Sequence, residues 1–235
     1  MAARPRRQGW PTRRLMAWWC AALLGLSLVV TGQDWPEWDF AQIIKTAEQR
    51  NNGLGSAKDR LQDWAKLLQS AAQQPERQQL DAVNSFFNRQ LRFEDDMTVW
   101  HQVDYWATPE EALIKGAGDC EDYAIAKYFS LRRLGVPSQK LRITYVKALT
   151  QNQAHMVLTY YSSDRADPLV LDNLIGEIRP ASQRKDLLPV YAFNAEGIYM
   201  PGAASGNKAS DTKKLSRWQD LLKKMKAEGF AIGDG

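Results

Sequence analysis

Three residues could together perform cysteine chemistry: Cys120, His155 and Asp172. Cys120 is the only cysteine after residue 32 and lies in the segment Gly-Asp-Cys-Glu-Asp, where we expect a helix to begin. Unpaired backbone N–H groups and the helix dipole at such a position stabilise a thiolate. His155 and Asp172 follow on two predicted strands and supply a base and a group that orients the base. The order therefore predicts a nucleophile, a base and its orienter.

Each of these residues also has a purely structural interpretation. Cys120 would then be a small buried apolar side chain, His155 a hydrogen-bonded core histidine and Asp172 the first residue of a turn. The catalytic interpretation is favoured because the cysteine, the histidine and the aspartate occur in this order in a chain with one cysteine after residue 32. His101, the other histidine, lies in an aperiodic stretch, and we expect it to be structural or exposed. One cysteine and two histidines are too few soft ligands for a typical zinc site.

Acidic residues flank the cysteine at Asp119, Glu121 and Asp122. Their negative charge opposes formation of a thiolate unless that charge is neutralised. Asp119 is also a good N-cap residue for the helix, which leaves the backbone N–H of Cys120 free to bind a developing oxyanion. A cluster of carboxylate oxygens is what a hard cation such as Ca²⁺ requires. The acidic flank therefore has either a capping role or a calcium role.

The first 32 residues are typical of a secretory signal peptide. Five arginines precede an apolar run over residues 15–30, which ends in Thr31 and Gly32. This run is shorter than the roughly 20 residues of a comfortable membrane span, although a retained signal anchor stays open, and it is the only expected membrane contact. Without the five arginines the net charge of +4 becomes −1. No later segment concentrates Lys and Arg with aromatic residues, so we expect no nucleic-acid binding.

Residues 33–235 are enough for one domain with a sizeable core. Apolar residues recur with a helical period from residue 34 to about 89, with expected helix starts near Ser56 and Pro75. The stretch 91–106 is aperiodic and is expected to be a loop. Thr108, Pro109 and Glu111 form the pattern of a capping box at the start of a short helix.

The next elements place the three chemical residues. A helix from Asp119 to Leu134 is apolar on nearly all sides and is expected to be central and buried. The period then changes to that of strands, which we expect over residues 141–146, 155–161, 169–172 and 189–193. A last amphipathic helix carries Leu215, Trp218, Leu222 and Met225. Helices followed by strands predict an α+β domain, with the cysteine on the central helix and the histidine and aspartate on an antiparallel sheet.

The residues around the predicted triad resemble a known family, the bacterial transglutaminase-like cysteine proteinases, and within it the LapG-type periplasmic proteases. The resemblance is carried by Gly118–Ala124, Leu134–Pro137, Ala154–Leu158 and Val170–Asn173, in that order. It implies a papain-like, transglutaminase-like fold with Cys120 as nucleophile, His155 as base and Asp172 as orienter.

The resemblance also implies a function and its control. It implies calcium dependence through Asp119 and Glu121, with Asp122 as a further ligand. It implies a periplasmic protease that cuts the N-terminal region of a large surface adhesin, which releases the adhesin and disperses biofilm. It further implies restraint by the periplasmic domain of an inner-membrane cyclic-di-GMP receptor.

Two other functions remain open from the residues alone. Transglutaminases and arylamine acetyltransferases use the same three residues for acyl transfer to an amine, and a triad does not reveal whether water or an amine is the acceptor. A non-catalytic binding module of the cell envelope is the third possibility, and it predicts an ordinary, slowly reacting Cys120 thiol.

Overall fold

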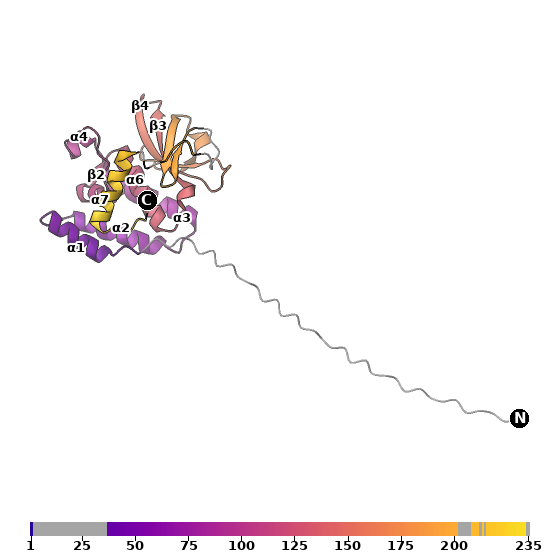
Figure 1. Ribbon diagram of the computed structural model, residues 1–235, viewed down its shortest axis with the longest axis horizontal. Helices are drawn as coiled ribbons and strands as arrows, with labels where there is room; N and C mark the ends of the chain where they lie inside the picture. The colour runs from indigo at the N-terminus through magenta and orange to yellow at the C-terminus, as the bar shows by residue number, and fades with distance from the viewer. Residues whose placement is uncertain (2–36, 202–207, 212, 214, 234–235) are drawn as a thin grey trace. The chain divides into compact units, whose positions relative to one another are not determined.

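The computed structural model describes residues 1, 37–201, 208–211, 213 and 215–233 (Figure 1). The expected signal peptide lies outside this described part, apart from Met1. Gly32–Gly235 forms one structural unit. No helix in the described ranges combines the length and apolar character needed to cross a membrane.

Three helices form the first layer, as the helical period predicts: α1 (Phe40–Arg50), α2 (Ala57–Ala71) and α3 (Glu76–Gln90). Asp39 caps α1 by accepting a hydrogen bond from the backbone N–H of Gln42 at 3.0 Å. Ser56 occupies the N-cap position of α2 but makes no capping hydrogen bond with its side chain, and Pro75 is the N-cap of α3 rather than its first helical residue. The predicted helices are confirmed, and their ends differ slightly.

The expected loop at residues 91–106 contains short regular elements. β1 (Arg92–Phe93) pairs in parallel with β2 (Ala117–Gly118), and α4 (Asp96–Val99) forms a single turn between them in sequence. α5 (Pro109–Lys115) begins at the predicted capping box, with both Thr108–Glu111 hydrogen bonds present. Gly116 ends α5 with a φ of 64°, a left-handed conformation that favours glycine.

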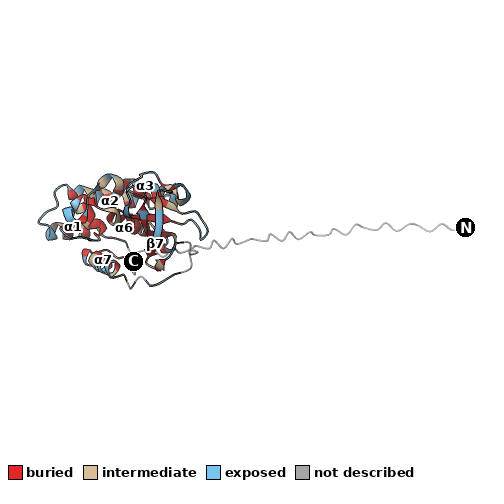
Figure 2. Ribbon diagram, turned by 90° about the horizontal axis from the view of Figure 1, so that it is seen from above, coloured by how far each residue is buried: buried red, intermediate tan, exposed pale blue. Residues whose placement is uncertain are grey.

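The central helix is α6 (Cys120–Arg133), and it is buried along most of its length, as predicted (Figure 2). It packs against α3 on one side and against the sheet strand β4 on the other. Its fully buried residues include Tyr128 and Phe129, which belong to the main core. Because α6 lies between both layers, its first residue is placed where the layers meet.

The sheet has six strands in the order β6-β5-β4-β3-β7-β8, and all neighbours are antiparallel. The predicted strands are confirmed as β3, β4, β5 and β7, whereas β6 and β8 were not expected. A 3₁₀ turn precedes β3, η1 (Ser138–Lys140), and a second one follows β6, η2 (Ala181–Gln183). The strands are β3 (Leu141–Ala148), β4 (Gln153–Tyr160), β5 (Leu169–Leu171), β6 (Arg179–Pro180), β7 (Leu187–Asn194) and β8 (Gly197–Tyr199).

The two faces of the sheet are covered differently. Met156, Leu158 and Leu171 face the main core, whereas Val157 and Val170 alternate with them and belong to a small cluster on the outer face. A pocket of about 210 Å³ opens on this outer face.

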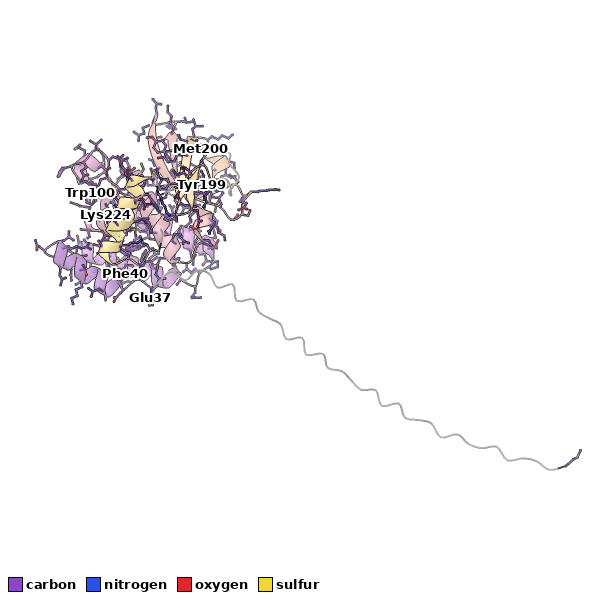
Figure 3. The ribbon with its side chains drawn as sticks, in the orientation of Figure 1. Glu37, Phe40, Trp100, Tyr199, Met200 and Lys224 are labelled. Atoms are coloured by element: carbon purple, nitrogen blue, oxygen red, sulfur yellow. The ribbon has the colours of Figure 1, made fainter. Side chains whose placement is uncertain are left out.

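The last helix, α7 (Ser216–Glu228), is the predicted amphipathic helix. Trp218 of α7 is buried and packs on Phe129 of α6 and Phe193 of β7, with ring centroids 5.5 Å apart in both cases. Lys224 of α7, labelled in Figure 3, donates from Nζ to the carbonyl oxygen of Trp106 at 2.7 Å, and its Nζ lies 3.9 Å from the centroid of the Tyr105 ring. α7 thus joins the loop at residues 91–106 to the core.

Candidate active site

The candidate nucleophile lies at the first residue of α6, as predicted. Asp119 precedes it in the N-cap position with extended backbone. Gly118 must be small, because a Cβ atom there would lie 2.6 Å from Asp122 Oδ2. The Cys120 thiol is half-buried and donates to Glu121 Oε2 at 3.0 Å. The tight turn from β2 into α6 therefore fixes the sulfur beside its acidic neighbours.

The strand that carries His155 lies directly beside this sulfur. The backbone N–H of Met156, the next residue along β4, lies close enough to the Cys120 sulfur to lower the pKa of the thiol. The described pairing between β5 and β4 begins at Leu158, two residues beyond Met156. The start of α6 therefore lies beside the strand that carries His155.

His155 and Asp172 form a buried pair. His155 Nε2 lies 2.8 Å from Asp172 Oδ1, and their side chains are 3% and 0% exposed. Asp172 immediately follows β5, which ends one residue earlier than predicted. Burial raises the pKa of Asp172, but hydrogen bonds from His155 and Arg184 outweigh burial and lower that pKa to about 2. The carboxylate is therefore ionised at neutral pH and can orient the imidazole.

The electrostatic surroundings oppose a thiolate. Burial raises the pKa of the Cys120 thiol, and the charges of Glu121 and Asp119 raise it further, whereas the Met156 N–H lowers it. Burial and the nearby acids thus act against the stabilisation that a helix start gives to a thiolate. The expectation that those acids oppose ionisation agrees with the structure.

The acidic residues near the sulfur gather more oxygens than the sequence indicated. Carboxylate oxygens of Asp96, Asp119 and Asp122 lie within 4.8 Å of one another, as do those of Asp96, Asp104 and Glu121. Asp96 Oδ1 and Asp119 Oδ1 are buried without a hydrogen-bond partner among the described residues. Burial, followed by neighbouring carboxylates, raises the pKa of Asp119 to about 10. Crowded, unpaired carboxylate oxygens fit a hard cation such as Ca²⁺.

Asp122 has a structural role in this cluster. Its Oδ1 accepts from the backbone N–H of Ala107 at 2.8 Å, and its Oδ2 accepts from that of Asp119 at 3.3 Å. The side chain is fully buried. Asp122 therefore ties the start of α6 to the segment before α5, in addition to its place among the candidate cation ligands.

Sequence reasoning missed three residues of the site. Asp96 and Asp104 lie in the stretch expected to be a plain loop, where their acidity was the only available signal. Arg184 donates to Asp172 Oδ2 at 2.6 Å, and it follows η2 in a polar segment with no pattern that distinguishes it. His101 is exposed, as expected, and has a φ of 57°.

Comparisons with known proteins place the chain in a family of cysteine proteinases. Residues 58–186 match the family model described as bacterial transglutaminase-like cysteine proteinase BTLCP. The chain is similar to Legionella pneumophila LapG, with 44% identity, a TM-score of 0.68, and coverage of 79% of this chain and 97% of that chain. An EGTA-treated form gives 44% identity, a TM-score of 0.70 and the same coverage. A calcium-bound form of Legionella pneumophila LapG gives 43% identity and a TM-score of 0.68, with coverage of 78% of this chain and 98% of that chain. No curated protein matches the chain.

Proposed function

Because the chain belongs to the bacterial transglutaminase-like cysteine proteinase family, we propose that it is a calcium-dependent periplasmic endopeptidase with Cys120, His155 and Asp172 as its triad. The observation that carries the proposal is the buried His155–Asp172 pair, next to which the Met156 N–H of β4 faces the Cys120 sulfur. Family membership supports a cysteine protease, and the geometry supports the assignment of roles.

The hydrogen bonds assign a nitrogen to each role. Asp172 accepts the Nε2–H of His155, which leaves Nδ1 as the base. Nδ1 takes the thiol proton as sulfur attacks the scissile carbonyl carbon. The C–N bond then breaks, and the leaving amine takes the proton from Nδ1. Water, deprotonated by Nδ1, finally cleaves the thioester, and Cys120 recovers its proton.

Two further groups support these steps. The backbone N–H of Cys120, at the start of α6, is placed to bind the oxyanion of the tetrahedral intermediate. Asp96, Asp104, Asp119 and Glu121 would hold Ca²⁺, together with Asp122. When bound, the ion supplies positive charge that offsets the carboxylates which raise the pKa of Cys120. The calcium-bound and EGTA-treated forms of Legionella LapG support this part of the proposal.

We extend the proposal to substrate and control. The substrate is the N-terminal region of a large surface adhesin, cut within an Ala-Ala segment, so that cleavage releases the adhesin and disperses biofilm. The periplasmic domain of an inner-membrane cyclic-di-GMP receptor restrains the protease. The support for these statements is the likeness to LapG.

The decisive test mixes the purified protein with the N-terminal fragment of a large repeat adhesin from the same cell. We expect one cut with calcium, little cutting with EGTA, and none with Cys120→Ala. A labelled amine added to the same reaction separates hydrolysis from acyl transfer, because only acyl transfer yields a conjugate. Undiminished cleavage by Cys120→Ala would remove the proposed nucleophile.

A further inference from the structure

The carboxylate of Asp172 is held at both of its oxygens. Oδ1 lies against His155 Nε2, and Oδ2 accepts from Arg184 Nη2 at 2.6 Å. The Asp172 and Arg184 side chains are 0% and 1% exposed. A carboxylate anchored on one oxygen cannot rotate about its Cβ–Cγ bond without losing a charge-assisted hydrogen bond. The second oxygen therefore sets the direction in which the first oxygen faces the imidazole.

Arg184 is itself fixed from the outside. Its Nη2 also donates to Asp186 Oδ2 at 2.8 Å, and its Nε donates to Asp186 Oδ1 at 3.0 Å. The Asp186 side chain is 32% exposed, so the pair reaches the surface. The backbone N–H of Arg184 closes the η2 turn on the carbonyl of Ala181 at 2.9 Å. One nitrogen, Nη2, thus bridges the two carboxylates.

The charges in this arrangement are compatible with a working base. A buried arginine beside Asp172 alone would cancel the negative charge that stabilises a protonated His155. Asp186 offsets Arg184, so the three residues together keep one net negative charge. Lys127 of α6 is a further charged group whose field reaches Asp172, and burial lowers the pKa of Lys127 to about 7.

We propose that Arg184 is a positioning residue, which fixes the orientation of Asp172 and, through it, the ring of His155. This inference rests on the proposed cysteine protease function. Without Arg184, Asp172 Oδ2 would remain buried with no partner, and the carboxylate would be held through Oδ1 alone, by His155 and by the Leu174 N–H at 3.1 Å. The base would then spend less time in line with the sulfur.

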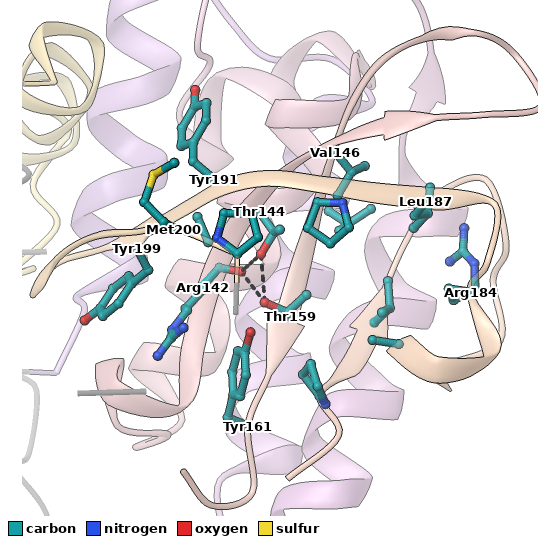
Figure 4. Close-up of a pocket in the computed structure, with 17 residues that line it drawn as sticks. Arg142, Thr144, Val146, Thr159, Tyr161, Arg184, Leu187, Tyr191, Tyr199 and Met200 are labelled. Carbon is teal, nitrogen blue, oxygen red and sulfur yellow. Dashed lines mark hydrogen bonds between the residues drawn. The ribbon is translucent and has the colours of Figure 1, made fainter. Parts of the chain in front are cut away.

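The position of Arg184 also offers a chemical test. Arg184 lines the outer-face pocket of about 210 Å³, at the end where Leu187 lies (Figure 4). Truncation of the Arg184 side chain would leave a hole that opens toward this pocket. A free guanidinium ion can then enter the hole and replace the missing group.

The first experiment compares Arg184→Met and Arg184→Lys with the wild type on the adhesin fragment in calcium. For Arg184→Met we expect kcat to fall by about 10- to 100-fold, with KM changed by less than about 2-fold because no substrate contact is lost. Arg184→Lys keeps a donor and a charge, and should recover part of kcat. Arg179→Met is the matched control, since Arg179 forms an exposed ion pair with Glu177 at 2.7 Å.

The second experiment adds guanidinium chloride to Arg184→Gly, far below denaturing concentrations, with urea as the comparison. We expect guanidinium to restore kcat and urea to leave it low, with the melting temperature of the variant followed in parallel. If Arg184→Met does not fold, the same kinetic comparison is made with Asp186→Ala. It removes the outer anchor without leaving a bare buried charge, and should lower kcat at unchanged KM.

The outcomes separate this inference from the proposed function. A wild-type kcat in folded Arg184→Met, or in Asp186→Ala where Arg184→Met does not fold, overturns the positioning role and leaves the protease intact. The positioning role is also overturned if urea and guanidinium restore the kcat of Arg184→Gly equally, or if neither of them restores it. Absence of cleavage by the wild type, or undiminished cleavage by Cys120→Ala, defeats the proposed function instead.

Discussion

At the scale of single residues, the surroundings of Cys120 act on the pKa of its thiol in opposite directions. The helix start and the Met156 N–H favour the thiolate, whereas burial, Glu121 and Asp119 raise the pKa of the thiol. The reactivity of this cysteine therefore depends on how the nearby carboxylates are neutralised.

This dependence predicts that calcium changes thiol chemistry even in the absence of substrate. Calcium should lower the pKa of Cys120, so iodoacetamide should modify Cys120 faster near neutral pH with calcium than with EGTA. Glu121→Gln removes a principal charge and should react faster than the wild type in EGTA. A rate that is equal in calcium and EGTA would count against the ion as the source of activation.

The candidate cation site leads to a second residue-scale prediction. Asp96 is buried, and its Oδ2 accepts from the Tyr105 N–H at 2.5 Å, which leaves Oδ1 for a cation. Asp96→Asn should weaken calcium binding by about 10- to 100-fold, measured by titration calorimetry. The exposed neighbour Asp95 provides the control, and Asp95→Asn should bind nearly as the wild type does. Equal affinities in both variants would exclude Asp96 as a ligand.

The site was predictable where residue type alone is informative. A lone cysteine at a helix start, followed by a histidine and an aspartate on strands, restricts the chemistry severely, and the structure brings their elements together. Arg184 and Asp104 were not predictable, because arginine and aspartate are ordinary in polar segments. Their roles arise from folding, which places a distant segment against the site.

At the scale of elements, the end of α7 contains an unfavourable buried acid. Glu228 is 5% exposed and accepts from Thr108 Oγ1 at 2.8 Å. Burial, followed by the charges of Glu110 and Glu111, raises the pKa of Glu228 to about 9. Between pH 4.5 and 9 the folded protein holds a proton that the unfolded chain releases, so this group lowers stability as the pH rises through that window.

Glu228→Gln should therefore stabilise the protein at pH 8 but not at pH 4. The amide oxygen can still accept from Thr108, and no charge is buried. One pKa unit corresponds to about 1.4 kcal/mol, and we expect a gain of roughly 1–3 kcal/mol in the free energy of unfolding at pH 8 from urea titrations. The exposed Glu177→Gln should change stability little at either pH. A pH-independent gain would show that the ionisation of Glu228 is not its cause.

Element types were predicted well, and boundaries less well. The spacing of Phe40, Ile43 and Ala47 predicts α1 because one apolar stripe must face the core. The single-turn α4 escaped prediction because four residues cannot show a period. β8 escaped for a similar reason, since it is three residues long and begins with glycine.

At the scale of the whole molecule, α7 holds the two layers together through Trp218. This side chain packs on Phe129 of α6 and Phe193 of β7, and it is 1% exposed. Trp218→Ala should lower the free energy of unfolding by about 3–5 kcal/mol, measured by urea denaturation. Leu188 is 54% exposed, and Leu188→Ala should cost much less. Similar losses in both variants would show that α7 does not close the core.

The α+β class followed from the change of apolar period near residue 138, since helices and strands that are separate in sequence usually form separate layers. The outer face of the sheet was not predictable. Val157 and Met156 are both apolar, and only the packed structure shows which of them faces α6.

The outer-face pocket has a consequence for inhibition. A small molecule lodged there would contact Arg184 from the outer face of the sheet, and Cys120 is not among the described residues that line this pocket. Its effect would fall on turnover rather than on peptide affinity, so raising the peptide concentration would not overcome it. Noncompetitive inhibitors of this kind would also spare other thiol enzymes, because they would never need to react with a cysteine.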